Sequence, residues 1–323
     1  MRLLKLVPDN TNIGFVRLRF WAFGLTAFLT VLAIGLVFAR GLNMGVDFVG
    51  GVMIEEKFTS PPPLDKLRTV VDALGVGDAS LQQLGDANSV SIRLPAPQST
   101  DDAATNKLVK QVEVGIAKQF PGAVSTHYDT VSGKVSGELV RNGILAVVLA
   151  VLGIGLFAIF RFEWQFGVST VVAIMHDVLM TLGFFALFRE YLEFDLNIVA
   201  AVLTIIGYSI NDKIVIDDRI RENMRRYRKM DMREIIDLSV NETLPRTVMT
   251  SLTILLALVA LILFGGHVLR GFTAAMILGI FVGTYSSIYV SSSLLITLGL
   301  RPEPEVEEKS KSRAERVRAK DLP

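Results

Sequence analysis

One apolar stretch of the sequence carries polar side chains where a membrane-spanning helix would lie in lipid. The stretch begins near Leu196 and reaches Ile216, and within it are Asn211, Asp212 and Lys213. A charged group at membrane depth costs about 2.5–3.5 kcal/mol on insertion scales, so such groups usually face a protein interior or a water path and have a partner. This arrangement is typical of proteins that move protons or ions.

A second polar pair, His176 and Asp177, lies in the middle of another apolar run. Ten uncharged residues of that run precede the pair and eleven follow it, which places both side chains about 15 Å from either end of a helix. At that depth Asp177 must be paired, protonated or hydrated. Two interpretations stay open: Asp177 binds and releases a proton, or it only accepts a hydrogen bond from a hydroxyl of a neighbouring helix.

Arg246 begins a further apolar run at about the same depth as Asp212. A cross-helix ion pair between them is geometrically reasonable, although arginines at cytoplasmic helix ends also follow from the positive-inside rule. Lys213 can reach water from this depth, and Asp217, four residues further along the helix, helps to hold it. Two interpretations stay open: Lys213 is an interfacial anchor, or it takes part in a polar relay. Possible hydrogen-bonding neighbours of Asp212 on its own helix are Tyr208, Ser209 and Asn211.

Composition and hydropathy indicate a membrane protein with several spans. Of the 323 residues 51% are hydrophobic, and the mean hydropathy is +0.47, which is too apolar for an ordinary soluble chain. About 20 apolar residues in a helix cross the hydrocarbon layer. The first qualifying run is longer than the core of a signal peptide, so we expect it to be retained. The six qualifying runs are 21–39, 143–160, 166–188, 196–216, 247–264 and 272–298.

The composition also excludes several classes of protein. There is no cysteine, so disulfides, thiolate metal sites and thiol nucleophiles are excluded. His127, His176 and His267 are scattered along the chain, and the sequence contains no nucleotide-binding phosphate loop. With a net charge of +1, no overall field favours nucleic acid as a partner. We therefore expect no metal and no cofactor, and we do not expect an enzyme.

Lysine and arginine in the short loops predict the orientation in the membrane. The segment 217–246 holds eight of these residues, whereas the short loops on the other side hold only Arg189 and Arg270. The terminal segments 1–19 and 301–323 fall on the basic side. We therefore expect both termini in the cytoplasm, together with a basic cytoplasmic loop at 217–246.

The fold class predicted is an α-helical membrane protein of six transmembrane helices with one periplasmic domain between helices 1 and 2. The first helix occupies 20–39, the domain 40–142, and helices 2–6 lie within 143–300. The domain pattern is βαββαβ, the order of a ferredoxin-like fold. A unit of this size buries one modest core, so we expect a contact module. Its expected elements are strands at 52–58, 80–84, 90–94 and 123–130 and helices at 64–74 and 105–120.

Two further patterns concern glycine and other small residues. The segment 45–51, Gly-Val-Asp-Phe-Val-Gly-Gly, follows the first span. A backbone bend at positive φ explains Gly50 and Gly51, and a binding role for Asp47 is the alternative. In the sixth run, small residues recur every four positions and predict a flat ridge where another helix packs closely, within this chain or in a second one. The ridge residues are Ala275, Gly279, Gly283, Ser287 and Ser291.

Several short motifs, taken together and in this order, resemble the SecF family of bacterial protein-export membrane proteins. The resemblance covers most of the chain, and although any one motif is weak, the set at these spacings is highly specific. The motifs are the 45–51 turn, Phe-Glu-Trp at 162–164, His-Asp-Val at 176–178, Ile-Gly-Tyr-Ser-Ile-Asn-Asp at 206–212, Asp-Arg-Ile-Arg-Glu-Asn at 218–223, Leu-Phe-Gly-Gly at 263–266 and Gly-Thr-Tyr-Ser-Ser-Ile-Tyr-Val at 283–290.

The resemblance implies a six-span half of a transporter of the resistance-nodulation-division type in a bacterial inner membrane, with SecD as the other half. It implies use of the proton gradient to help an unfolded preprotein leave the SecYEG channel after the ATP-driven push of SecA. YajC and YidC are further partners that the family implies. The lipid bilayer is the surrounding medium, and nucleic acid has no part.

The resemblance also assigns roles to single residues. Asp212 matches the family's fourth-span proton-relay aspartate, and Arg246 matches its fifth-span arginine. Position 213 is more often small or hydroxylated in the family, so Lys213 departs from the pattern. A cation in contact with Asp212 would favour its ionised form, which puts a simple relay through Asp212 alone in question. The other candidate relay or gating residues are His176, Asp177, Asn211 and Lys213.

Two rival functions stay open. One is a proton-coupled exporter of small molecules from the same superfamily, which predicts twelve spans and two large external domains in one chain. The other is a passive assembly factor whose buried charges only fix the register of the helices. Replacement of Asp177 and Asp212 by asparagine separates the relay from the passive role, because only the relay needs groups that bind protons.

Overall fold

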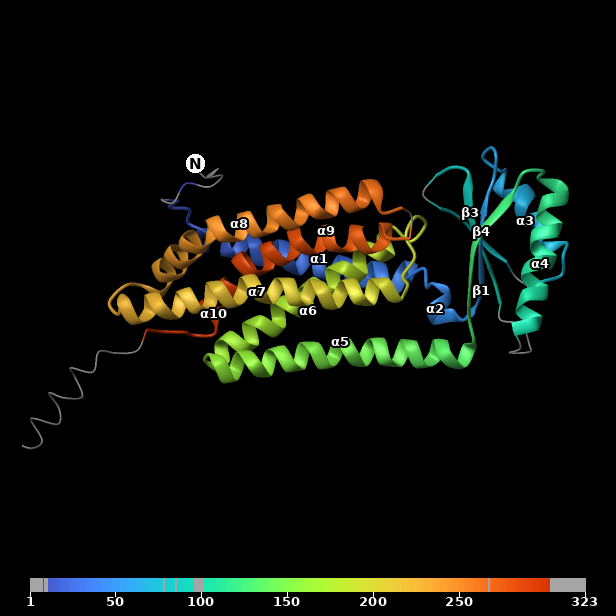
Figure 1. Cartoon of the computed structure of the whole chain (residues 1–323). Helices are drawn as coiled ribbons and strands as arrows, with labels where there is room; N and C mark the ends of the chain where they lie inside the picture. Colours follow the sequence, from blue (N-terminus) through green and yellow to red (C-terminus); the bar gives the residue numbers. More distant parts are fainter. Residues whose placement is uncertain are drawn as a thin grey trace, which may run out of the picture.

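The computed structural model describes residue 8 and residues 11–77, 79–84, 86–95, 102–266 and 268–302. Within these residues the chain forms a bundle of long helices and a smaller α/β unit at one end of the bundle (Figure 1). The α/β unit is inserted between the first and second long helices. His267 and most of the expected charged tail lie outside the described residues.

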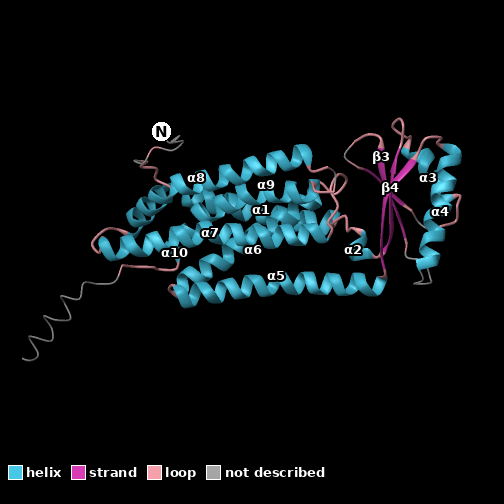
Figure 2. Ribbon diagram, viewed as in Figure 1, coloured by secondary structure: helices cyan, strands magenta, loops and turns pink. Residues whose placement is uncertain are grey.

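Six helices in the described part of the chain are long and apolar enough to cross a membrane, as the sequence predicts. Figure 2 shows them as the cyan bundle. The first is preceded by a short turn, η1 (Val16–Leu18), and the sixth is built from three consecutive segments. The helices are α1 (Arg19–Arg40), α5 (Gly133–Arg161), α6 (Trp164–Leu187), α7 (Leu196–Arg226), α8 (Met232–Phe264) and α9 (Arg270–Tyr285) with η2 (Ser286–Ser291) and α10 (Ser292–Thr297).

Helices α7 and α8 are longer than their apolar runs. The segment 217–246, expected as a basic cytoplasmic loop between two spans, is helical except for a short connecting turn. Ile216 and Ile220 continue the buried face of α7 at helical spacing. The Asp231 carboxylate caps α8 by accepting a hydrogen bond from the Arg233 amide at 2.7 Å. The basic side chains therefore project from two helix ends.

Helix α5 also begins earlier than its apolar run, at Gly133 instead of 143. Ser132 caps it, since its hydroxyl accepts a hydrogen bond from the Val135 amide at 3.4 Å. The last strand of the α/β unit ends at Val131, and the expected domain boundary at 142 falls within the first turns of α5. In α5, as in α7 and α8, the apolar run marks only the hydrophobic part of the helix, and the helix itself is longer.

The α/β unit is one antiparallel sheet in the strand order β2-β3-β1-β4. Helices α3 and α4 cover one face of it (Figure 1). On the central strand, Val52 is opposite Leu94 on β3 and Thr130 on β4. Val52 and Ile54 face the helices and form a closed core with them. The elements are β1 (Gly51–Lys57), α3 (Leu64–Asp72), β2 (Ser80–Gln83), β3 (Ser89–Leu94), α4 (Asp102–Gln119) and β4 (Val124–Val131).

One acidic side chain lies in this core. Glu56 on β1 is buried, and its Oε1 has no hydrogen-bond partner among the residues that the structure describes. Burial and, to a smaller extent, the nearby negative charge of Glu113 on α4 together raise the pKa of Glu56 to about 7. The Glu56 carboxyl is therefore mostly protonated below neutral pH, which lowers the cost of burying it.

The segment 45–51 connects the α/β unit with the start of α7. It contains a one-turn helix, α2 (Val46–Val49), followed by Gly50 at φ 77° and Gly51 at φ 125°, which is backbone that favours glycine. The Asp47 carboxylate accepts a hydrogen bond from the Leu196 amide at 2.9 Å. Asp47 is therefore more than part of a bend, because it contacts the first residue of α7.

Backbone pairing fixes the same connection. The Gly45 amide donates to the Phe194 carbonyl at 2.9 Å, and the Phe194 amide donates to the Asn43 carbonyl at 2.7 Å. Met44 and Phe194 form a short parallel bridge. The chain leaving α1 and the chain entering α7 are thus joined like two short strands, directly beneath the α/β unit.

Candidate functional site

Asp177 lies in the middle of α6 and is enclosed by α7 and η2. Its side chain is completely buried. Its Oδ2 accepts hydrogen bonds from the Ser209 hydroxyl on α7 at 2.6 Å and from the Ser286 hydroxyl on η2 at 3.0 Å. Hydrogen bonds to an ionised acceptor are about twice as strong as neutral ones. One carboxylate oxygen therefore ties α6 to two other elements of the bundle.

His176 extends this polar cluster towards α1. Its Nδ1 lies 3.1 Å from Asp177 Oδ1, and its Nε2 is buried without a hydrogen-bond partner in the described part of the chain. The ring centroid of Tyr285 lies 6.4 Å from that of His176. The Tyr285 hydroxyl reaches Thr26 Oγ1 at 3.1 Å and the Ala22 carbonyl at 3.0 Å. The cluster thus connects α6, α9 and α1.

Ser286 begins a π-helical segment, η2, between α9 and α10. π-Helical turns are rare and often lie at functional sites, because they turn side chains out of the regular helical register. We did not single out Ser286 from the sequence. The signal that marks it is the run of serines inside an otherwise apolar helix, all of them buried: Ser286, Ser287, Ser291, Ser292 and Ser293.

The ridge of small residues packs against α7 of the same chain. A Cβ at Gly279 would lie 2.3 Å from Ile205, and a Cβ at Gly283 would lie 3.3 Å from Ser209, so the close approach depends on glycine. The Ser287 hydroxyl donates to the Ser209 carbonyl at 3.4 Å. The remaining ridge residues, Ala275 and Ser291, are also buried.

Asp212 lies three residues beyond Ser209 on α7, and its carboxylate has fewer contacts. It is only 2% exposed, yet its Oδ2 has no hydrogen-bond partner within the described residues. The Tyr208 hydroxyl binds Ser251 on α8 at 2.6 Å instead of reaching Asp212. Asn211, the preceding residue, is exposed on the surface of this chain. Asp212 therefore has one buried oxygen that is unpaired within the described residues.

Arg246 on α8 does not form the expected ion pair with Asp212 in the described part of the molecule. Its side chain is exposed. The Arg246 charge nevertheless acts on the Asp212 carboxylate across the α7–α8 contact, so the two groups are neighbours without a direct ion pair.

Lys213 is buried, so its interpretation as an interfacial anchor is wrong. Its ammonium forms an ion pair with Asp217, four residues along α7, and both side chains are 2% exposed. The ammonium also lies 5.6 Å from the ring centroid of Phe166 on α6. The lysine therefore points into the bundle towards α6, and its charge is held by Asp217.

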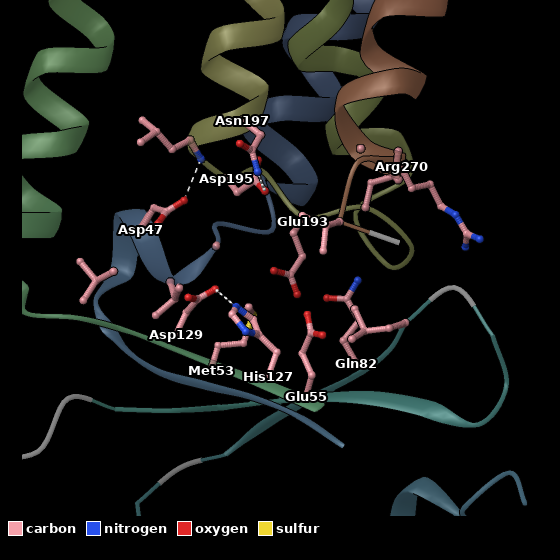
Figure 3. A pocket seen from close by; sticks show the side chains of 18 of the residues that line it. Asp47, Met53, Glu55, Gln82, His127, Asp129, Glu193, Asp195, Asn197 and Arg270 are labelled. Carbon is pink, nitrogen blue, oxygen red and sulfur yellow. Dashed lines mark hydrogen bonds and ion pairs between the residues drawn. The ribbon is translucent and has the colours of Figure 1, made fainter. Parts of the chain in front are cut away.

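A cavity of about 380 Å³ lies between the open face of the sheet and the loops that precede α7 and α9. Figure 3 shows Glu193, from the loop before α7, pointing towards Glu55 and Gln82 on the sheet. Burial raises the pKa of both Glu193 and Asp195. Acidic side chains thus face one another where the α/β unit meets the bundle.

Arg93 on β3 joins the two parts of the molecule beside this cavity. Its guanidinium donates to the Met44 carbonyl at 2.7 Å and to Asn43 Oδ1 at 3.0 Å, and it forms an ion pair with Glu193 at 3.1 Å. Sequence reasoning missed Arg93, since a single arginine in a strand carries no signal of its partners.

Comparisons with known proteins agree on one family. The model described as "Protein export membrane protein SecD/SecF, C-terminal" matches residues 111–301, and "SecD/SecF GG Motif" matches residues 35–61. Protein translocase subunit SecF of Cereibacter sphaeroides is 40% identical over 307 residues, which are 92% of this chain and 93% of the relative. The protein of the same name from Vibrio alginolyticus is 40% identical over 311 residues, which are 94% of this chain and 97% of the relative.

The solved structures show the same similarity over part of a longer chain. SecDF from Thermus thermophilus, described as a translocon-associated membrane protein, matches with 37% identity and a TM-score of 0.82, over 91% of this chain and 39% of that chain. SecDF in a super-membrane-facing form matches with 34% identity and a TM-score of 0.65, over 96% of this chain and 40% of that chain. Because SecF relatives match along nearly their whole length, the chain belongs to the SecD/SecF family of protein-export membrane proteins, as a SecF subunit of the bacterial protein translocase.

Proposed function

We propose that the chain is the six-span half of a proton-driven unit that assists the export of unfolded preproteins. SecD supplies the second half, and the unit acts at the SecYEG channel after SecA, with YajC and YidC as accessory partners. The observation that carries this proposal is Asp212, a buried carboxylate with one oxygen left without a partner among the described residues, inside a membrane-spanning helix. Groups of this kind bind and release protons.

The surface next to Asp212 supports a partner half. Asn211 and Arg246 are exposed on this chain, and polar groups at this depth are costly against lipid. A second membrane subunit that covers this face removes the cost and completes the surroundings of Asp212. This chain matches only 39% of the solved SecDF chain, which agrees with a second membrane subunit of similar kind as the other half.

The interior groups form the rest of the proposed relay. Asp177 accepts its hydrogen bonds best when ionised, so protonation weakens its hold on Ser209 and Ser286 and loosens α7 and η2 relative to α6. His176, with one buried nitrogen without a partner in the described residues, takes or gives a proton beside it. A proton that arrives thereby changes helix packing, which is what a pump must do.

The α/β unit is proposed as the part that meets the exported chain on the outer side of the membrane. Its strand order and its βαββαβ sequence of elements support a ferredoxin-like fold. The basic ends of α7 and α8 support a cytoplasmic location for that side of the bundle and for both termini. No catalytic step is assigned to the chain, since its proposed work is proton-linked movement.

The proposal is tested with the full chain co-expressed with SecD in inner-membrane vesicles. Export of a signal-bearing preprotein is measured with and without a proton gradient, which an ionophore collapses. Asp212→Asn is expected to reduce export to the level of ionophore-treated vesicles, because asparagine does not ionise. Asp218→Asn is the matched control, since Asp218 is an exposed neighbour on the same helix, and it is expected to export normally.

The same experiment separates the rival functions. Normal proton-linked export by Asp212→Asn, with normal amounts of the complex, contradicts the relay and favours a passive assembly factor. A drug-sensitive phenotype of the same variant with unchanged protein export favours a small-molecule exporter.

A further inference from the structure

Lys213 and Asp217 form an ion pair that is closed to water. Each side chain is 2% exposed. Phe166 lies under the ammonium, and Ile216 and Ile220 of the same helix belong to an apolar cluster that also contains Ile235 and Ile236 of α8. A buried ion pair is weak support for stability in itself, but removal of one partner leaves a charge that must find another.

The position of this pair is important because Lys213 directly follows Asp212 in the chain. Asp212 has a buried oxygen without a hydrogen-bond partner in the part of the chain that the structure describes. An ammonium that approached it would hold the carboxylate in its ionised form. The structure shows the ammonium turned away from Asp212 and bound to Asp217 instead.

The other acidic groups near α7 are already engaged. Asp218 pairs with Arg161 at the end of α5. Glu242 on α8 is bound by Arg219, at 2.7 Å. Among the described acidic side chains discussed for this end of α7, only Asp212 therefore remains to attract the ammonium once Asp217 is gone.

Asp177 on α6 is engaged as well. Its Oδ2 accepts hydrogen bonds from Ser209 and Ser286, and its Oδ1 faces His176. Arg246 on α8 is a cation whose charge already acts on Asp212 without forming an ion pair with it, and it repels the ammonium. The electrostatic surroundings of Lys213 therefore leave Asp217 as its partner and Asp212 as the alternative.

We propose that Asp217 is a positioning residue that holds the Lys213 ammonium away from Asp212 and so leaves Asp212 free to take up a proton. This inference rests on the proposed role of Asp212. It has a distinctive consequence: the loss of Asp217 alone is more harmful than the loss of Asp217 and Lys213 together, because the second change removes the cation that the first one frees.

The test measures protonated Asp212 directly. The full chain, co-expressed with SecD in membrane vesicles, is treated with dicyclohexylcarbodiimide, which reacts with protonated carboxyls in apolar surroundings, and the labelled peptides are quantified by mass spectrometry. Asp217→Ala is expected to lower labelling of Asp212 by about tenfold or more, the change that a cation at close range produces. Lys213→Ala with Asp217→Ala is expected to restore labelling and proton-linked export to within about twofold of the parent.

Two further variants keep the result interpretable. Asp218→Ala removes a carboxylate that does not hold Lys213. Labelling of Asp212 in this variant is expected to equal that in the parent. If Asp217→Ala does not assemble with SecD, Asp217→Asn takes its place, since the amide keeps the size and one oxygen acceptor but lacks the charge. Both the labelling and the export arms are then repeated with that variant and with its double variant.

The inference is overturned if Asp212 labels equally in the parent and in the Asp217 single variant, or if the double variant labels as weakly as the single one. Failure of the proposed function looks different. In that case Asp212→Asn exports normally, while the labelling contrast among the Asp217 and Lys213 variants is still observed.

Discussion

Asp177 and Asp212 are buried carboxylates on neighbouring helices, but their surroundings differ. Asp177 lies at the junction of α6, α7 and η2, where two serine hydroxyls and a histidine occupy its oxygens. Asp212 lies near the α7–α8 surface, where one of its oxygens has no partner within the described residues. We call the first the closed site, because this chain supplies its partners, and the second the open site, because one buried oxygen lacks a partner among the described residues.

This difference separates two requirements of the proposed proton-driven function. A group that controls helix packing needs contacts with several elements, so that a change in its charge is felt by all of them. A group that exchanges protons needs an accessible oxygen, a water path or a partner. In this chain Ser209 and Asp212 lie three residues apart on α7, so one helix carries both a contact of the closed site and the open site itself.

The largest effect is expected at the closed site. Asp177→Asn removes the negative charge that accepts from Ser209 and Ser286, and charged hydrogen bonds contribute about 1.5–3 kcal/mol each. We expect a clear loss of thermal stability of the purified complex together with loss of proton-linked export. Asp212→Asn should lose export without the loss of stability. Equal melting temperatures for the two variants contradict the distinction between the sites.

Glu56, a buried carboxyl in the α/β unit, tests whether the contrast between Asp177 and Asp212 depends on the membrane. Glu56 has its pKa raised to about 7 in the folded unit, above its ordinary value of about 4.5, so the folded state binds the proton more tightly. The contribution of Glu56 to the free energy of unfolding is therefore fully present below about pH 4.5. It is lost as the pH rises through 7, and the loss is at most about 3 kcal/mol. Glu56→Gln should abolish this fall.

The measurement is hydrogen exchange of β1 and β4 in the full chain, comparing parent and variant at each pH between 5 and 8. Slower exchange in Glu56→Gln is expected at pH 8, and little difference is expected at pH 5. Glu113→Gln is the matched companion, since loss of the Glu113 charge should shift the fall to lower pH. A parent protein that is equally protected at both ends of this range contradicts the prediction.

The open site predicts a smaller effect that appears only in the complex. Arg246→Gln changes an exposed side chain, so the isolated chain should melt at the parent temperature. Association with SecD should weaken by roughly 1–2 kcal/mol, about five- to thirtyfold, if Arg246 meets the partner. Co-purification at graded detergent stringency measures this. An unchanged yield of SecD indicates that Arg246 faces lipid headgroups or water.

The smallest expected effect comes from single hydroxyls of the closed site. Ser286→Ala removes one of two donors to Asp177 Oδ2 and should lower stability by about 1 kcal/mol, with partial loss of export. Ser292→Ala is the control, because its hydroxyl binds the Ser287 carbonyl and not a carboxylate. A Ser286 variant that behaves like the Ser292 variant contradicts the role of Asp177 as a clamp.

Much of the fold follows from local patterns. Six apolar runs predict the six helices, and alternating and helical spacing predict the strands and helices of the α/β unit to within a few residues. The errors occur where amphipathic or polar turns continue a helix beyond its apolar part, as at 217–246 and before residue 143. Hydropathy does not detect these helical turns, because their stability comes from caps and from one buried face.

The sequence by itself also determined contacts within one helix, such as Lys213 with Asp217, because residues four apart share a helix face whatever surrounds them. Only the tertiary structure decided that Ser286 meets Asp177 across 109 residues, that Arg246 is exposed beside Asp212 without an ion pair, and that Arg93 reaches Met44 and Glu193. These contacts depend on how each helix is rotated and shifted against its neighbours. That rotation results from all packing contacts together, so no short stretch of sequence contains it.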